Sequence, residues 1–279
     1  MKKFEIENHE PSLLPDGEWK LAWADEFDGN KLDTSKWDFR LHLFHKRHEC
    51  WIEDEGIELD GNGNIVFKLV EKDGKYYSSQ LQTGENWYDR PGQNPDWDVA
   101  ELREPKFLHK FGYYECRCKL QSGDNWWSSF WLQSPTIGTH LDEKRAGVEV
   151  DILESFFGDS YIPNYIHFGG YGANYKFDTN NPTKKGATIN DVIHVDEGFH
   201  RFGVLWDEEG YTFFVDGKQQ GEKLKKGVSH TETFILLGTE CLGYRSYIPG
   251  IKKGAESTKI VKNDSFIVDY VRVFDEVKK

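Results

Sequence analysis

Apolar and polar residues alternate along most of the chain with a period of two. Such alternation indicates half-buried β-strands, because successive side chains of a strand point to opposite faces. Helical periodicity is short, near residues 33–39 and in the 140s, and residues 85–100 form the best long-loop candidate. The pattern predicts an all-β sandwich or barrel. It is clearest in segments 63–72, 111–123, 201–218 and 264–276.

One strand-like segment, GVEVDILESFFG at residues 147–158, carries three acids. Glu149 and Asp151 share a face, whereas Glu154 would fall on the opposite face of a regular strand. A β-bulge near Ile152 and Leu153 would insert one residue and bring all three carboxylates to one face. The Cα atoms of Glu149 and Glu154 would then lie about 13 Å apart, and side chains leaning together would bring the carboxyls to about 5 Å.

Two carboxyls at that separation suit a retaining glycosidase, in which one acid attacks the sugar and the other donates and then accepts a proton. Asp151, between them, would raise the proton affinity of a neighbour and help to keep a general acid protonated. Spacing alone leaves two other interpretations open, a solvated acidic face and a cation site.

Composition narrows the class of partner. The 279 residues are 15% aromatic, which predicts that some rings line a binding surface rather than the core. The formal net charge of −13 argues against nucleic acid and anionic membranes, since both need basic surface. We therefore expect a neutral polysaccharide or oligosaccharide as partner, and a monomer.

The cysteines and the N-terminus bear on the compartment. Cys50, Cys116, Cys118 and Cys241 form no zinc motif, so buried free thiols are expected. The opening MKKFEIENHEPS lacks the apolar run of a signal peptide, and no stretch of ~18 apolar residues would span a membrane. We expect either a cytoplasmic protein or a secreted one whose leader has been removed.

The ExDxxE motif in VEVDILES, residues 148–155, resembles the catalytic strand of glycoside hydrolase family 16. The resemblance extends over residues 20–275 and implies a single catalytic domain, with residues 1–18 as an N-terminal extension. It also implies a jelly-roll β-sandwich of two antiparallel sheets with a concave substrate cleft. The other stretches similar to this family follow in the same order along the chain, at 21–39, 110–135, 199–218 and 266–274.

The resemblance assigns Glu149 as nucleophile, Asp151 as auxiliary carboxylate and Glu154 as acid/base. The five-residue spacing matches the bulged branch of the family, typical of laminarinases, agarases and related galactan hydrolases, rather than lichenases or xyloglucan transferases. It implies an endo-acting retaining β-glycanase that requires no cofactor. Family frequency favours a β-1,3- or mixed-linkage β-1,3(4)-glucan. A β-galactan hydrolase, a transglycosylase and a non-catalytic glycan-binding protein stay open.

Aromatic and polar side chains near the cleft are candidates for substrate binding, because aromatic rings bind the C–H faces of sugars. The resemblance places Trp131 beside the cleaved bond. Core packing is the alternative for the tryptophans, and a structural histidine for His167. An acid at 240 favours a galactan, because laminarinase-like members carry a glycine-rich segment there. The candidates are Trp131, Trp127, Trp126, His167, Glu240, Trp97 and Trp87.

A structural calcium is a further expectation from the resemblance, because many family members hold one on the convex side. Glu26 and Asp269 occupy the matching positions. Calcium needs six or more oxygen ligands, so two ordinary surface acids are the alternative interpretation.

Overall fold

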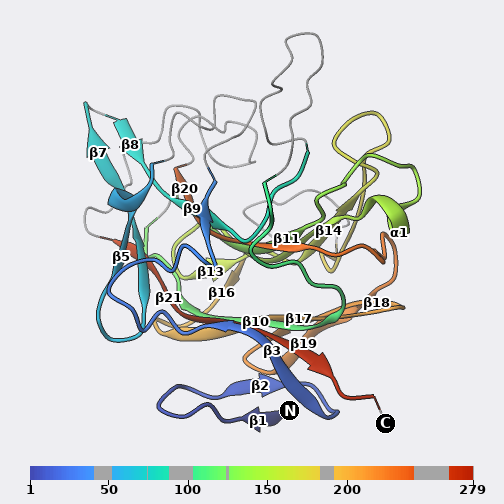
Figure 1. Ribbon diagram of the computed structural model, residues 1–279, viewed down its shortest axis with the longest axis horizontal. Helices are drawn as coiled ribbons and strands as arrows, with labels where there is room; N and C mark the ends of the chain where they lie inside the picture. The colour runs from blue at the N-terminus through green and yellow to red at the C-terminus, as the bar shows by residue number, and fades with distance from the viewer. Residues whose placement is uncertain are drawn as a thin grey trace.

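Two large antiparallel sheets lie face to face in the computed structural model of the chain (Figure 1). This arrangement confirms the all-β sandwich of two antiparallel sheets expected from the sequence. The structure describes residues 1–40, 52–73, 75–87, 103–123, 126–182, 192–241 and 264–278.

The outer sheet contains the segments with the clearest alternation. In order across the sheet its strands are β19 (Lys218–Leu224), β18 (Gly210–Val215), β17 (Phe199–Asp207), β10 (Gly112–Lys119), β21 (Ser265–Glu276), β6 (Ile65–Lys68) and β5 (Ile57–Leu59), and β3 (Trp19–Asp25) also pairs with β21.

The inner sheet holds the acidic segment on its third strand. Its order is β15 (Lys176–Thr179), β14 (Tyr165–Phe168), β12 (Glu149–Ser155), β11 (Trp126–Gln133), β20 (Phe234–Cys241), β9 (Gln80–Gln82) and β4 (Asp38–Phe39). Short elements complete the described chain: the pairs β1 (Lys2–Phe4) with β2 (Ser12–Leu14), β7 (Val70–Lys72) with β8 (Lys75–Tyr77) and β13 (Ser160–Tyr161) with β16 (Ile193–His194), the 3₁₀ helix η2 (Asp54–Gly56) and the helix α1 (Glu143–Ala146).

Of the two short helices expected, only α1 forms. Residues 33–37 instead make a turn, closed by hydrogen bonds from the backbone N–H groups of Lys36 and Trp37 to the Asp33 carbonyl, both 3.0 Å. The chain leaves the turn as β4 because Trp37 is buried in the core, where its Nε1 donates to Asp25 Oδ2 at 2.7 Å. Tertiary burial of one tryptophan thus overrides the local helical signal.

The main core fills the space between the sheets. Alternate residues of the inner strands, such as Phe130, Leu132 and Val150, point into it and are fully buried. Cys116 and Cys118 are buried free thiols, as predicted, whereas Cys50 and the side chain of Cys241 lie outside the described part. Because one face of the inner sheet packs into this core, the other face is available for polar side chains.

Residues 1–18 pack below the outer sheet as the β1–β2 hairpin (Figure 1). Leu14 contributes to a small apolar cluster with Tyr113, Phe214 and Phe274. The hairpin therefore covers the outer sheet and leaves the inner sheet uncovered by it. No helix in the described residues is both long and apolar enough to cross a membrane.

Candidate active site

Strand β12 contains the bulge that the spacing of the acids requires. Its register with β11 skips Ile152 between Asp151 and Leu153. Ile152 and Leu153 are both buried in the main core, so two consecutive residues point the same way. The alternation then restarts with Glu154 on the face that carries Glu149 and Asp151, and the predicted bulge is confirmed.

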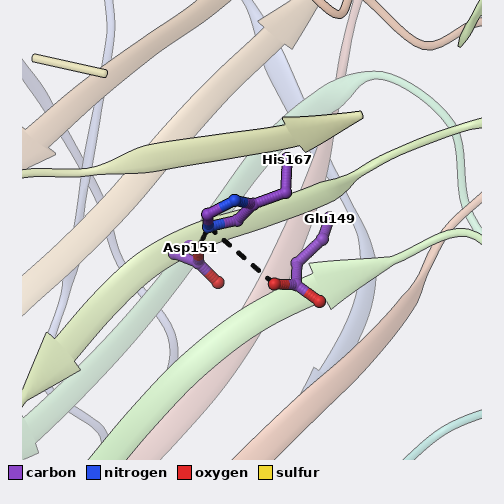
Figure 2. Close-up of side chains that lie close together, drawn as sticks. All are labelled: Glu149, Asp151 and His167. Carbon is purple, nitrogen blue, oxygen red and sulfur yellow. Dashed lines mark ion pairs between the residues drawn. The ribbon is translucent and has the colours of Figure 1, made fainter. Parts of the chain in front are cut away.

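Beside these acids lies His167 on β14, directly opposite Glu149 in the register (Figure 2). Its Nε2 is 2.8 Å from Asp151 Oδ2 and 3.9 Å from Glu149 Oε1. Nδ1 lies 2.6 Å from the Tyr175 hydroxyl. The Tyr165 ring stacks on the imidazole with centroids 5.7 Å apart. Asp151 and Tyr175 therefore contact the two ring nitrogens of His167, and Tyr165 stacks on its ring.

The charge of His167 follows from these contacts. Burial lowers its pKa, but the charge and hydrogen bond of Asp151, and the charge of Glu149, raise it to about 9. Ligand atoms of Glu149, Asp151 and His167 lie within 4.8 Å of one another, an arrangement that in outline could hold a metal ion. Without a metal ion, the protonated imidazole is the cation that balances the carboxylates.

Glu149 sits among hydrogen-bond donors. Gln133 Nε2 donates to its Oε2 at 3.0 Å, and the Tyr171 hydroxyl donates to the same oxygen. Burial and the charge of Asp151 raise the pKa of Glu149, whereas His167, the Tyr171 hydrogen bond and Arg40 lower it, and the net shift is upward.

Glu154 is more strongly perturbed. Burial and the nearby charge of Asp151 raise its pKa well above the usual range, and Glu149 adds to the effect. His167 and a side-chain hydrogen bond from Trp127 act in the opposite direction but do not cancel it. These surroundings shift the carboxyl toward its protonated form, the form that a proton donor needs.

Two tryptophans of β11 flank the acids. Trp131, opposite Asp151, packs on Phe234 and Leu236 and is 8% exposed. The Arg40 guanidinium carbon lies 4.8 Å from the centroid of its ring.

Trp127 lies near the other end of the site. Its ring centroid is 4.8 Å from that of Phe156. Glu240, which is buried, is its partner in the register with β20. Trp127 and Glu240 thus share one end of the inner sheet with Glu154, whose pKa Trp127 lowers.

The remaining candidates are Trp87, Trp126 and Trp97. Trp87 is tied to another segment by Nε1, which donates to the Ile137 carbonyl at 2.7 Å. Trp126 belongs to β11, but its side chain is outside the described residues, as is the whole of Trp97. Substrate contact by these three stays a prediction.

Glu26 and Asp269, the calcium candidates, are each paired with an arginine. Arg272 donates through Nε and Nη2 to the two oxygens of Glu26, at 2.8 and 2.7 Å. Arg117 pairs with Asp269. Calcium at this place stays a prediction, and an ion would have to compete with two guanidinium groups.

Among the site residues that were not singled out from the sequence are Gln133, Tyr171 and Arg40. Gln133 carries a signal in retrospect, because the alternation Trp127, Ser129, Trp131 continues to it on the same face. Tyr171 is marked only by its glycine neighbours in GGYG. Arg40 has no local signal, since its place near Trp131 depends on how β4 joins the sheet.

Comparisons with known proteins agree with this geometry. A family model described as β-porphyranase A–D, GH16 domain, matches residues 19–276. Glucan endo-1,3-β-glucosidase A1 of Niallia circulans is 26% identical over 71% of this chain and 28% of its own length. β-Porphyranase D of Zobellia galactanivorans is 28% identical over 67% of this chain and 43% of its own length. The chain thus spans less than half of either relative.

Solved structures show the same fold. The laminarinase catalytic domain of Thermotoga maritima superposes with a TM-score of 0.61 over 94% of this chain and 100% of that domain, at 22% identity. At that identity the likeness speaks for the jelly-roll fold alone. The family model, in contrast, covers almost the whole chain and includes the bulged acidic strand, so this chain belongs to glycoside hydrolase family 16.

Proposed function

We propose that the chain is an endo-acting retaining β-glycanase whose substrate is a β-galactan of the porphyran or agar class. One observation carries the catalytic part: two glutamates lie on the same face of one bulged strand. Burial and Asp151 raise the pKa of both, but Glu149 also accepts hydrogen bonds from Gln133 and Tyr171 and faces His167.

The roles follow from these surroundings. Glu149, as the carboxylate, attacks the anomeric carbon while Glu154 gives its proton to the departing glycosidic oxygen. Glu154, now ionised, takes a proton from the water that releases the sugar from Glu149. Asp151 holds His167 in its charged form and raises the pKa of both glutamates. The overall result is hydrolysis with retention of configuration.

Both the comparisons and one residue of the site support a galactan substrate. The matching family model is that of β-porphyranases, and β-porphyranase D is among the relatives. The acid at Glu240 points in the same direction, because the resemblance links an acid at this place to galactan-active members.

A β-1,3-glucan is the second candidate, and one observation favours it. The relative from Niallia circulans is a glucan endo-1,3-β-glucosidase and aligns over 71% of this chain. Its identity to this chain, 26%, is close to the 28% of the porphyranase, so sequence distance does not separate the two substrates.

Reducing-sugar release on porphyran, agarose, laminarin, barley mixed-linkage glucan and arabinogalactan tests the proposal. Glu149→Gln should lose at least about a thousandfold in turnover, while the matched control Glu197→Gln, at an exposed side chain paired with Lys119, should behave as wild type. Highest activity on porphyran or agarose supports the galactan, and highest activity on laminarin selects the glucan.

Two further outcomes would reject hydrolysis. If wild type and Glu149→Gln bind one polymer equally and neither cleaves it, the chain is a glycan-binding protein. If the wild type forms longer oligosaccharides in preference to new reducing ends, it is a transglycosylase, because sugar rather than water then accepts the glycosyl group.

A further inference from the structure

Tyr171 is a residue of the site that the sequence did not single out. It lies in the connection between β14 and β15, and 40% of its surface is exposed. Its hydroxyl nevertheless donates a hydrogen bond to Glu149 Oε2 and also contacts Gln133 Nε2. Tyr171 is therefore partly exposed to solvent, but the hydrogen bond of its hydroxyl to Glu149 gives the side chain a defined position.

The backbone before Tyr171 is built to direct it there. Gly169 and Gly170 have φ of +77° and +74°, a left-handed conformation that glycine adopts without strain. A Cβ at Gly169 would lie 2.2 Å from the Asn174 carbonyl oxygen, and one at Gly170 would lie 2.9 Å from Gly138 Cα. The two glycines therefore permit a tight reversal that brings the next side chain back toward β12.

Gln133 supplies the second donor and is itself oriented. Asn86 Nδ2 donates to Gln133 Oε1, which leaves Nε2 of the same amide to face Glu149 at 3.0 Å. Asn86 and Gln133 are both buried. Glu149 Oε2 thus receives donors from β11 and from the β14–β15 connection, while Oε1 is the oxygen that faces His167.

We infer that Tyr171, together with Gln133 and Asn86, is a positioning residue that fixes Glu149 by Oε2 and so determines which carboxylate oxygen attacks the sugar. The inference rests on the proposed role of Glu149 as nucleophile. A carboxylate held by two donors has lost its freedom to rotate, and such pre-organisation raises the rate of the chemical step.

Removal of the hydroxyl has a consequence that a purely structural residue would not produce. A donor to a carboxylate stabilises the ionised form, so Tyr171→Phe should raise the pKa of Glu149 by about one unit. The other groups that face Glu149 are unchanged in this variant and cancel in the comparison; they are Asp151, His167, Glu154, Tyr175 and Arg40.

The experiment combines a titration without substrate and a kinetic measurement. The ¹³C signal of the Glu149 carboxyl, assigned by its loss in Glu149→Gln, is titrated in wild type, Tyr171→Phe and Tyr76→Phe. Tyr76 is a matched control on the β7–β8 hairpin at the opposite side of the molecule (Figure 1). Steady-state rates on the best polysaccharide of the panel follow for each variant.

We expect Tyr171→Phe to raise the Glu149 pKa, to lower kcat by about tenfold with KM little changed, and Tyr76→Phe to match wild type. A Glu149 pKa that is identical in wild type and Tyr171→Phe would show that the Tyr171 hydroxyl does not stabilise the Glu149 carboxylate. An unchanged or increased kcat would refute the positioning role of Tyr171. Failure of the proposed function gives a different result: the Glu149→Gln variant would then still turn over the polysaccharide.

Discussion

The charge on His167 should set the pH range of activity, and its removal in His167→Gln tests this. The Nε2 of His167 lies 3.9 Å from Glu149 Oε1. At about that distance two opposite charges attract by roughly 1 kcal/mol with the dielectric constant of water and by roughly 4 kcal/mol with the effective value of ~20 found for proteins. Because one pKa unit corresponds to about 1.4 kcal/mol, loss of the charge should raise the pKa of Glu149 by about one to three units.

The sign of the change is the same for both glutamates. With the proposed roles, the acidic limb of the activity profile reports ionisation of Glu149 as nucleophile, and the basic limb reports loss of the proton from Glu154 as acid. The charge of His167 lowers the pKa of each. Both pKa values therefore rise in His167→Gln, and the whole bell-shaped profile moves to higher pH, with reduced activity below neutrality.

The assay is kcat/KM from reducing-sugar release between about pH 4 and pH 10. His200→Gln is the matched control, since His200 is also held by two carboxylates, Asp196 at 2.9 Å and Asp216 at 2.7 Å, but lies on β17 of the outer sheet. Its profile should coincide with that of wild type. If the acidic and basic limbs of the His167→Gln profile lie within a few tenths of a pH unit of those of wild type, the electrostatic role of His167 is refuted.

Three further predictions concern the acids. Glu154→Ala should be inactive on polysaccharide, whose leaving group needs a proton, but on an aryl glycoside with a good leaving group azide should partly restore turnover because it needs no general base; the glycosyl azide should keep the β configuration, and an α product would mean inversion. Asp151→Asn removes a charge that raises the pKa of Glu154, so the basic limb should move to lower pH by about one unit, and a limb that stays in place would contradict the coupling. EDTA tests the predicted calcium at Glu26 and Asp269: a drop in Tm that added calcium reverses would demonstrate a bound ion, whereas an unchanged Tm would mean that Arg272 and Arg117 are the only partners these acids need.

The sequence by itself determined the class of fold and the acidic strand. Alternation is a local property, so the segments around β10, β17, β18 and β21 could be recognised without knowledge of their partners. The bulge could be predicted as well. Three acids with spacings of two and three on a strand reach one face only if a residue is inserted between Asp151 and Glu154.

Only the tertiary structure decided which side chains surround each of the two glutamates. Tyr171 reaches Glu149 across 22 residues, and Gln133 reaches it across 16, while the place of Arg40 depends on how β4 joins the sheet. The turn at Asp33 and the arginine partners of Glu26 and Asp269 likewise depend on packing. Such contacts join segments that are distant in the chain, and no local pattern records them. Burial and charge at each carboxyl, and with them its pKa, therefore exist only once the sheets have assembled.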